Sequence, residues 1–495
     1  MALRLFNTLS GKTEEFHPLE DNLVRLYACG PTVYDYGHIG NFRTFIAVDV
    51  LRRFLKQCGY KITHVMNITD VEDKIIRNAA RDGLSVQDYT RKYITAFLED
   101  ADALNIERPE LLVKATDHIQ EMAHFIAELR DKGYAYAAED GSYYFRIARF
   151  PEYGKLSKKD FAGMTDGARV DVDEYEKDNA RDFALWKAPK PGEASWDTEI
   201  GPGRPGWHIE CSQMSMKYLG DSFDIHCGGE DLIFPHHENE IAQSESLTGK
   251  PFVKYWVHSR FLLVEGEKMA KSAGNFYTVR DLVLMGHKPS SIRFLLMSVP
   301  HHKQLNFTFA GLTQAASSVD RLRNFKLRLQ TSKFPQGNNP VIAGLADRAS
   351  KEMREGLEDD LNTARALGAV FELVTDVNAA LDAGQVKQDD APLVQKVLDQ
   401  FDAVFAVLND DDATKVRATV EWANREGRAD KISAAAAEVA KAASLSDEEV
   451  EKLVAEHSQA RQSRNFARSD AIRNQLAESG IVLENTKDGV RWRRK

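Results

Sequence analysis

Cysteine is scarce in this sequence, with four residues among 495. A chain of this length can bury enough apolar surface to fold without cross-links, so a disulfide framework is not expected. Free thiols indicate a reducing compartment and leave the cysteines available as metal ligands. The four are Cys29, Cys58, Cys211 and Cys227.

Long apolar runs are missing as well. No uninterrupted apolar stretch approaches the ~18 residues that a membrane-spanning helix requires. Near the N-terminus, Lys12, Glu14 and Glu15 interrupt the chain before a secretory apolar region can form. We therefore expect a cytoplasmic protein with no membrane contact.

A basic charge balance is also lacking, because the formal net charge is −10. This excludes a uniformly basic nucleic-acid coat but not a local basic patch, since the field that attracts a polyanion is local. With 43% apolar and 28% charged residues, the composition is that of a globular protein. A length of 495 residues predicts about two to four domains.

The N-terminal part has the pattern of a βαβ unit. Residues 23–29 and 61–68 have the apolar pattern of strands, and residues 41–58 between them have helical periodicity. This order predicts an α/β fold with a Rossmann-like parallel sheet. Ligands bind at the carboxyl ends of such strands. Three candidate site residues fall there, namely Cys29, His38 and Thr69.

The pattern changes along the chain predict five segments. Residues 1–115 and 206–340 are expected to form two halves of one α/β domain, with 116–205 as an insertion between them. Residues 341–445 are expected to form a helical bundle, and 446–495 a small C-terminal α/β unit.

Within these segments, amphipathic periodicity predicts helices at 119–132, 357–381 and 393–408. The acidic run 410–412 and the alanine-rich stretch 434–443 are interpreted as surface or linker.

Two short segments are candidates for binding ATP. Gly37-His38-Ile39-Gly40-Asn41 follows a predicted strand and enters a helix, whose N-terminal amides attract anions, and the glycines let a phosphate or purine approach closely. Lys268-Met269-Ala270-Lys271-Ser272 carries two lysines that could embrace a pyrophosphate leaving group. Each segment alone is more simply an ordinary turn or a solvated lysine pair. Their conjunction in this order favours a nucleotide site.

Several side chains are candidates for holding a metal. His236 and Glu240, four residues apart after Pro235, would project from one helix face, and His237 with Glu240 would do almost as well. Zinc accepts thiolate, imidazole and carboxylate together. A buried cysteine is usually only a small apolar side chain, so spacing leaves the ligand set open. The candidates are Cys29, His208, Cys211, His226, Cys227, His236, His237, Glu238 and Glu240.

The two nucleotide segments resemble the His-Ile-Gly-His and Lys-Met-Ser-Lys-Ser signatures of class I aminoacyl-tRNA synthetases. This sequence has Asn41 at the last position of the first and Ala270 in the middle of the second, so one hydrogen-bond donor is kept and one hydroxyl is lost. The resemblance implies that His38 and Asn41 hold the nucleotide. It also implies that Lys268 and Lys271 hold the transferring phosphates of ATP, with Mg²⁺ as counter-ion.

Three longer segments resemble the cysteinyl-tRNA synthetase family within this class, and the resemblance covers essentially the whole chain. They are Asn-Ile-Thr-Asp-Val-Glu-Asp-Lys-Ile at 67–75, Trp-His-Ile-Glu-Cys-Ser at 207–212, and the stretch 228–240 from Gly-Gly-Glu-Asp to His-His-Glu-Asn-Glu. The resemblance implies one zinc ion per chain. The ligands that it implies are Cys29, Cys211, His236 and Glu240.

The family implies two reaction steps. The cysteine carboxylate attacks the α-phosphate of ATP to give cysteinyl-adenylate and pyrophosphate, and the terminal ribose hydroxyl of tRNA(Cys) then attacks the acyl carbon. The partners expected of this monomer are therefore ATP, L-cysteine and tRNA(Cys). Zinc, with Cys29 beside the substrate, would bind the cysteine thiolate and reject the harder serine hydroxyl. Thr69 and Trp207 would line the amino-acid pocket, and Asp231 would hold the adenosine ribose.

The C-terminal unit supplies the local basic patch. Between residues 461 and 495, nine Lys or Arg stand against four Asp or Glu. Residues 464–470, Arg-Asn-Phe-Ala-Arg-Ser-Asp, resemble the anticodon-binding segment of the family, with Phe466 where Trp is usual. Stacking on a base survives that change, and Asp470 and Trp492 are the further candidate tRNA contacts.

Two other functions stay open on the sequence alone. A cysteine ligase of mycothiol synthesis resembles the catalytic core but lacks an anticodon domain, so the helices beyond 340 and the tail after 446 count against it. A non-catalytic zinc- and RNA-binding relative is opposed by the intact His38, Lys268 and Lys271.

Overall fold

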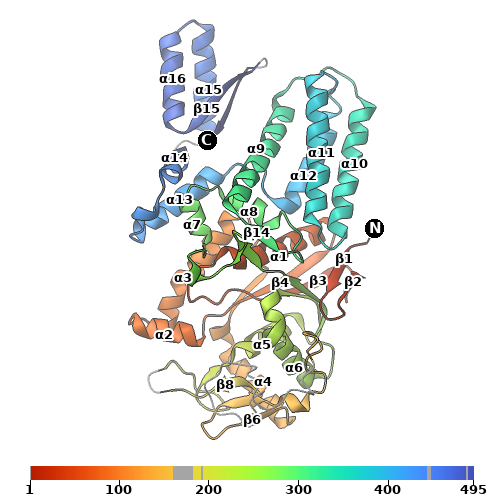
Figure 1. The fold of residues 1–495 in the computed structure, drawn as a ribbon, viewed down its shortest axis with the longest axis vertical. Coiled ribbons are helices and arrows are strands. Elements are labelled where there is room, and N and C mark those ends of the chain that lie inside the picture. The colour runs from red at the N-terminus through yellow and green to blue at the C-terminus, as the bar shows by residue number, and fades with distance from the viewer. Residues whose placement is uncertain (1, 160–181, 191–192, 443–446, 487–488, 495) are drawn as a thin grey trace.

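The computed structural model describes residues 2–159, 182–190, 193–442, 447–486 and 489–494 (Figure 1). Its centre is a parallel sheet of five strands in the order β11-β10-β3-β4-β5. The strands are β3 (Leu23–Ala28), β4 (Lys61–Ile68), β5 (Leu111–Lys114), β10 (Phe223–Gly229) and β11 (Val253–Ser259).

The predicted βαβ unit is confirmed, and with it the α/β class. Helix α1 (Ile39–Gln57) connects β3 to β4, and its fully buried face, which includes Phe42, Ile46 and Phe54, packs into the main apolar core. From β3 the chain adds strands toward β5 on one side and later toward β11 on the other. The strand order therefore reverses beside β3, and ligands of open parallel sheets bind at such a reversal.

The insertion forms its own small layer below the sheet (Figure 1). Helix α4 (Ile119–Asp131) confirms the predicted helix and is followed by a four-stranded antiparallel sheet. Its strands are β6 (Ala135–Ala137), β7 (Tyr143–Phe145), β8 (Phe183–Lys187) and β9 (Arg204–Pro205). The stacked rings of Phe145 and Phe183, 4.9 Å apart, lie in its core. The chain then returns to the central sheet through α5 (Trp207–Leu219), which leads to β10, and α6 (Glu238–Thr248) connects β10 to β11.

Four long helices stand together above the sheet (Figure 1). The prediction of one helix over 357–381 is wrong at its start, because the chain leaves the helical conformation at Asp360 and Leu361, whose φ angles are 54° and 53°. The second predicted helix, 393–408, ends earlier, because Ala406 is left-handed. The helices are α9 (Phe309–Thr331), α10 (Pro340–Glu358), α11 (Thr363–Asp382) and α12 (Ala391–Phe405).

The interpretation of the acidic run 410–412 as surface or linker holds for Asp410, which is exposed, but it is wrong for Asp412 at the end of the run. Asp412 is buried, begins α13 (Asp412–Arg425), accepts hydrogen bonds from the backbone and hydroxyl of Ser290, and lies 2.6 Å from Arg323. The alanine-rich stretch is also ordered, as α14 (Ala434–Ala442), with Ala436 fully buried. The composition of these two stretches shows that their side chains are polar or small, but it does not show which distant residues they pack against.

The C-terminal unit stands apart at one end of the molecule (Figure 1). It contains α15 (Asp447–Gln462), α16 (Phe466–Glu478) and the antiparallel pair β15 (Ile481–Thr486) and β16 (Gly489–Arg494), around its own apolar cluster. The domain limits drawn from the sequence remain predictions. Among the described residues, no helix has both the length and the apolarity needed to cross a membrane.

Candidate functional site

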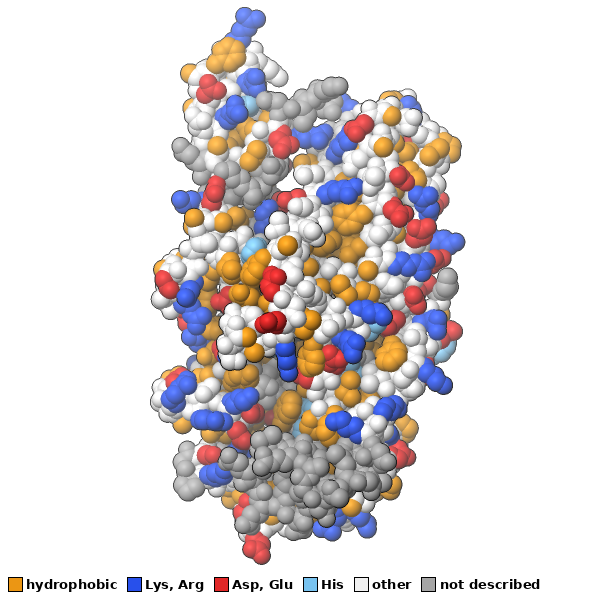
Figure 2. All heavy atoms as spheres, viewed as in Figure 1, with side chains coloured by type: hydrophobic (Ala, Val, Ile, Leu, Met, Phe, Trp, Pro, Cys, Tyr) orange, Lys and Arg blue, Asp and Glu red, His pale blue; other side chains and the backbone are white. Residues whose placement is uncertain are grey.

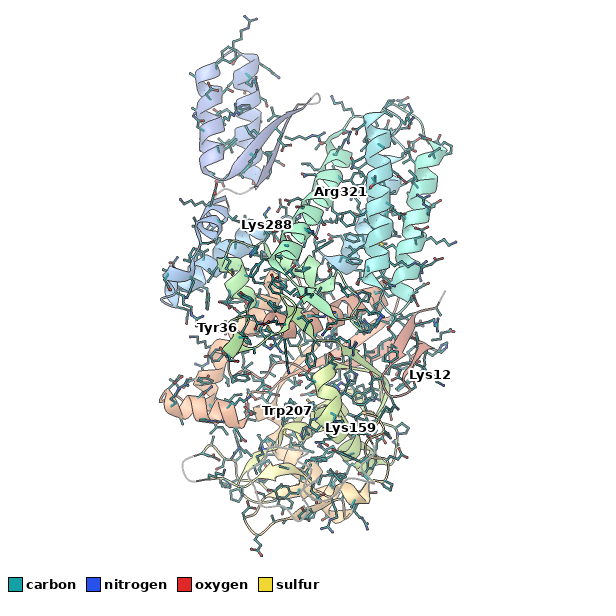
Figure 3. The ribbon with its side chains drawn as sticks, in the orientation of Figure 1. Lys12, Tyr36, Lys159, Trp207, Lys288 and Arg321 are labelled. Atoms are coloured by element: carbon teal, nitrogen blue, oxygen red, sulfur yellow. The ribbon has the colours of Figure 1, made fainter. Side chains whose placement is uncertain are left out.

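A pocket of about 680 Å³ lies at the carboxyl ends of β3, β4 and β10, where the strand order reverses. Figure 3 labels Tyr36 and Trp207, which line it from different segments of the chain. Of the residues that the family resemblance implies for the catalytic core, all but Glu240 lie on its wall. Those on the wall are Cys29, His38, Asn41, Thr69, Trp207, Cys211, Asp231, His236, Lys268 and Lys271.

The first nucleotide segment forms the N-terminus of α1. The Nδ1 atom of His38 accepts from the Asn41 backbone N–H, and Asn41 Oδ1 accepts from the His38 N–H, both at 3.2 Å. Asn41 thus caps the helix end whose amides and dipole favour an anion. A Cβ at Gly40 would lie 2.9 Å from His38 Nδ1, so a side chain there would displace the imidazole. Burial and the nearby Lys271 lower the pKa of His38 to about 4, which leaves it neutral at pH 7.

The second nucleotide segment faces the first across the pocket. Lys271 Nζ lies 2.5 Å from Asp35 Oδ2, and this contact raises the pKa of Lys271. The ring of Phe276 lies between the two segments, 5.0 Å from Lys271 Nζ and 5.1 Å from the His38 ring. Asn275 accepts from the Ala270 N–H and donates to the Lys268 carbonyl, which closes the loop.

Asp35, Phe276 and Asn275 were missed from the sequence. Their only signal there is that they flank the two nucleotide segments.

A buried cluster of sulfur, nitrogen and oxygen donors lies at the inner end of the pocket. Cys29 Sγ is 3.9 Å from Cys211 Sγ and 3.9 Å from Glu240 Oε1, and His236 Nε2 is 3.0 Å from Glu240 Oε1. Cys29 follows β3, Cys211 lies in α5, and His236 lies in the short helical turn Ile233–His237 that leads into α6. The structure therefore brings together the four residues that spacing alone did not select, with donor atoms within 4.8 Å of one another.

A second donor set overlaps the first and shares Cys29 and Glu240 with it. His237 Nε2 is 3.3 Å from Cys29 Sγ, and His226 Nε2 is 2.8 Å from Glu240 Oε2. Neither of these histidines borders the pocket, whereas Cys211 and His236 do. A ligand entering the pocket therefore meets the first set, while His226 and His237 support it from behind.

The supporting layer continues through His258, which sequence reasoning missed. His237 Nδ1 is 2.8 Å from His258 Nε2, and His258 Nδ1 is 2.8 Å from Thr8 Oγ1. The signal was present, because His258 lies near the carboxyl end of β11, as Cys29 follows β3. Cys227 is buried in the core and belongs to neither donor set.

Charge in this cluster is balanced internally. Burial alone would raise the pKa of Glu240, but His226 and His236 lower it to about 2. Burial would lower the pKa of His236, but Glu240 and Cys211 raise it to about 10. Burial would also raise the pKa of Cys211, but the hydrogen bond from Cys29 lowers it to about 6. Protonated His236 thus balances the charge of Glu240 and Cys211, while burial and the neighbouring Cys211 raise the pKa of the Cys29 thiol. A buried group of anionic donors that needs a compensating cation is the charge pattern of a metal site.

The walls beside the cluster hold its side chains in place. The Trp207 ring stacks on His236 with centroids 4.1 Å apart, and His208 Nδ1 lies 2.9 Å from His236 Nδ1. A contact to Nδ1 orients the ring and leaves Nε2 toward the cluster, as in metal-ligating histidines. Thr69 donates to the buried Glu210 at 2.8 Å and accepts from Asn67 at 3.1 Å.

Asp231 lies in the turn after β10, on the nucleotide side of the pocket. A Cβ at Gly229 would lie 2.3 Å from Asp231 Oδ1, so glycine is required for the carboxylate to take this position. Burial raises the pKa of Asp231.

The candidate tRNA contacts lie in the C-terminal unit. Phe466, the first residue of α16, is 60% exposed, and Asp470 is exposed one turn later. Trp492 is partly buried against the apolar cluster of Ile472, Leu476 and Ile481, which favours a structural role for its ring. Figure 2 shows basic and acidic side chains mixed over the visible face of the molecule.

Comparison with known families assigns each part of the chain. Residues 15–317 match the family described as the tRNA synthetases class I (C) catalytic domain. Residues 352–409 match the DALR domain, and residues 445–493 match the cysteinyl-tRNA ligase anticodon binding domain.

Relatives match over the full length. The chain is 74% identical to a cysteine–tRNA ligase of Koribacter versatilis and 54% identical to one of Solibacter usitatus, each over 100% of both chains. Among solved structures it is similar to Mycobacterium tuberculosis methionyl-tRNA synthetase in complex with methionyl-adenylate, at 14% identity and a TM-score of 0.55. That match covers 86% of this chain and 94% of the other, and it shows a shared fold.

Proposed function

The chain belongs to the cysteine–tRNA ligase (cysteinyl-tRNA synthetase) family, and we propose that it selects cysteine through a zinc ion held in the buried cluster beside its nucleotide pocket. The activity is ATP-dependent joining of cysteine to tRNA, as in its full-length relatives. The match to an anticodon-binding domain at 445–493 sets aside the amino-sugar ligase, which has no such domain. The observation that supports the zinc proposal is the pair Cys29 and Cys211 on the wall of that pocket.

The donors fit zinc, since two sulfurs, an imidazole nitrogen and a carboxylate oxygen are buried within 4.8 Å of one another. When bound, zinc supplies a soft Lewis acid that prefers a substrate thiolate to a hydroxyl. Glu240 is our candidate for the ligand that loosens to admit the substrate. Its Oε2 already accepts a hydrogen bond from His226, so the carboxylate keeps a partner if Oε1 moves away.

Residues at the pocket mouth would position ATP for attack by the cysteine carboxylate. Neutral His38 and the N-terminus of α1 would donate hydrogen bonds to phosphate oxygens. Lys271 would leave its ion pair with Asp35 and bind the pyrophosphate group of ATP instead. Lys268 would bind beside it, and Mg²⁺ would accompany the nucleotide. Asp231 would accept from the ribose hydroxyls.

The amino-acid side of the pocket would be formed by Thr69 and Trp207, with Cys29 beside the substrate sulfur. Phe466 and Asp470 would contact tRNA(Cys). We propose that the protein acts as a cytoplasmic monomer; light scattering of the purified chain, free and with tRNA, tests the monomer.

One experiment tests both the reaction and the zinc assignment. We expect ATP–pyrophosphate exchange with cysteine but not with serine, followed by charging of tRNA(Cys). In Cys211→Ser we expect zinc content to fall and the preference for cysteine over serine to be lost. The matched control is Cys58→Ser, which changes a cysteine outside both donor sets and should keep both properties. Retention of zinc and of cysteine preference in Cys211→Ser would exclude it as a ligand.

A further inference from the structure

A third group of potential metal ligands lies away from the pocket and consists of His301, His302 and Asp360. The two histidines lie between α8 (Pro289–Met297) and β14 (Leu305–Phe307), which belong to the catalytic part. Asp360 lies in the loop between α10 and α11 of the helical bundle. The group therefore joins two parts of the protein that the chain connects only through α9 and α10.

The separations suit a shared ion. His302 Nδ1 is 2.9 Å from Asp360 Oδ2, and His301 Nε2 is 3.9 Å from Asp360 Oδ1. Two ligands at about 2.1 Å from a tetrahedral metal are about 3.4 Å apart, a value between these two separations. The Phe6 N–H also donates to Asp360 Oδ1 at 2.8 Å, and such a contact orients a ligating carboxylate.

The two ring nitrogens of His301 lie in different surroundings. Its side chain is buried, and its Nδ1 has no hydrogen-bond partner among the described residues. Its Nε2 lies too far from Asp360 for a hydrogen bond. Nε2 is therefore available to an ion shared with Asp360, whereas the buried Nδ1 is not by itself evidence of a ligand, because both ring nitrogens of His64 are also buried without a partner among the described residues.

Solvent reaches the group from the His302 side, not through the small cavity behind His301. A cavity of about 20 Å³ also borders His301, but its wall is mostly apolar and includes neither His302 nor Asp360, so it is not the place where the three donors meet. The His302 side chain is 31% exposed, so water can supply a further ligand to an ion held there. Three protein donors and one solvent ligand make an open tetrahedral site.

Arg43 is the main opposing charge. Its guanidinium borders the same cavity and donates to the carbonyls of Leu296 and Lys303. Its positive charge disfavours a second cation nearby. We therefore expect weaker binding here than at the cluster that contains Cys29 and Cys211.

We propose that His301, His302 and Asp360 bind a second divalent transition-metal ion, of the zinc, cobalt or nickel class, which fastens the α10–α11 loop to the catalytic part. The ion has a structural role. It ties together the loop before β14, the bundle and the N-terminal strand β1 (Arg4–Asn7), which contributes Phe6.

Metal counting tests this site. The full chain, freed of metal and titrated with zinc against a chromophoric chelator, should bind two equivalents, one weaker than the other. His302→Tyr and Asp360→Asn should each lose the weaker equivalent, whereas Cys211→Ser should lose the tighter one. His124→Ala is the matched control, because it removes an exposed histidine paired with Glu199, and it should bind two equivalents.

A second readout separates lost binding from lost folding. In the Cys211→Ser background, added zinc should raise the melting temperature, and the additional change His302→Tyr should abolish that rise while the zinc-free melting temperature stays within a few degrees. One equivalent in the wild-type chain, unchanged by His302→Tyr, would overturn the proposal and leave the three side chains as an ion pair only. This outcome is independent of the aminoacylation assay, so it leaves the proposed function untouched.

Discussion

The guanidinium carbon of Arg280 lies 4.3 Å from the centroid of the Trp422 ring. Arg280 is in α7 (Val279–Leu284), just after the lysine loop, and Trp422 is in α13, which leads to the C-terminal unit. Arg280 also lies 5.7 Å from the ring of Tyr36 and 2.8 Å from Asp100 of α3 (Val86–Ala103). This contact connects both nucleotide segments to the helix that precedes the tRNA-binding part.

Trp422→Ala should destabilise the protein by about 3–5 kcal/mol, because it removes a large buried ring and its cation–π contact. Chemical denaturation measures the change. Trp422→Phe keeps an aromatic face over Arg280 and should cost less than half as much. Equal losses in the two variants would contradict this explanation, because neither buried volume nor an aromatic face over Arg280 would then account for the loss.

Lys271→Ala should slow ATP–pyrophosphate exchange by about 10²–10³-fold, because a donor aimed at developing charge is lost. Its unfolding free energy should change by less than about 1 kcal/mol, since the pair with Asp35 is largely exposed. Lys250→Ala, which removes a comparably exposed pair with Asp221, should leave the exchange rate unchanged. An unaltered rate in Lys271→Ala would contradict the assigned role.

Stability should fall on mild acidification because of His64. This side chain is buried in β4 with no hydrogen-bond partner for either ring nitrogen among the described residues, and burial with Arg52 lowers its pKa to about 3. Below pH 6.5, His64 becomes protonated in the unfolded chain but stays neutral in the folded chain. Proton binding by His64 in the unfolded chain should therefore make the free energy of unfolding about 2 kcal/mol lower at pH 5 than it is above pH 6.5.

In His64→Leu, the free energy of unfolding should lose about 2 kcal/mol less between pH 7.5 and 5 than in the unchanged chain, as measured by denaturant unfolding at each pH. A variant with the wild-type slope would show that other groups cause it.

Phe466→Ala should raise the KM for tRNA(Cys) by about tenfold or more, because a stacked base contributes about 1–3 kcal/mol. Phe466 is exposed at the start of α16, so the variant should keep its melting temperature and its exchange rate with cysteine. Phe466→Trp should charge tRNA as well as the unchanged chain does. A rise in KM that Trp does not prevent would indicate a contact other than stacking.

Local chemistry is what the sequence could predict. The capping pair His38 and Asn41 is three residues apart, and His236 with Glu240 is four apart, so helix geometry alone relates them. The spacing of apolar residues predicted the strands β3 and β4 and the helix between them. The long motifs identified the family.

Distant partners were beyond such reasoning. The acidic run around Asp412 has the composition of a solvated linker, yet its partners Ser290 and Arg323 lie 122 and 89 residues away. The break at Asp360 in the middle of an amphipathic pattern is imposed by left-handed backbone, not by composition.

By itself, the sequence determined the α/β class, the positions of the two candidate nucleotide segments and the chemistry of the available donors, because these depend on residue type and short spacing. Only the tertiary structure decided that Cys29 and Cys211, 182 residues apart, face the pocket while His226 and His237 lie behind it. It also decided that His301 and Asp360 meet at the base of the bundle. Packing of whole elements sets such contacts, and the energy of that packing is shared among many residues far apart in the chain.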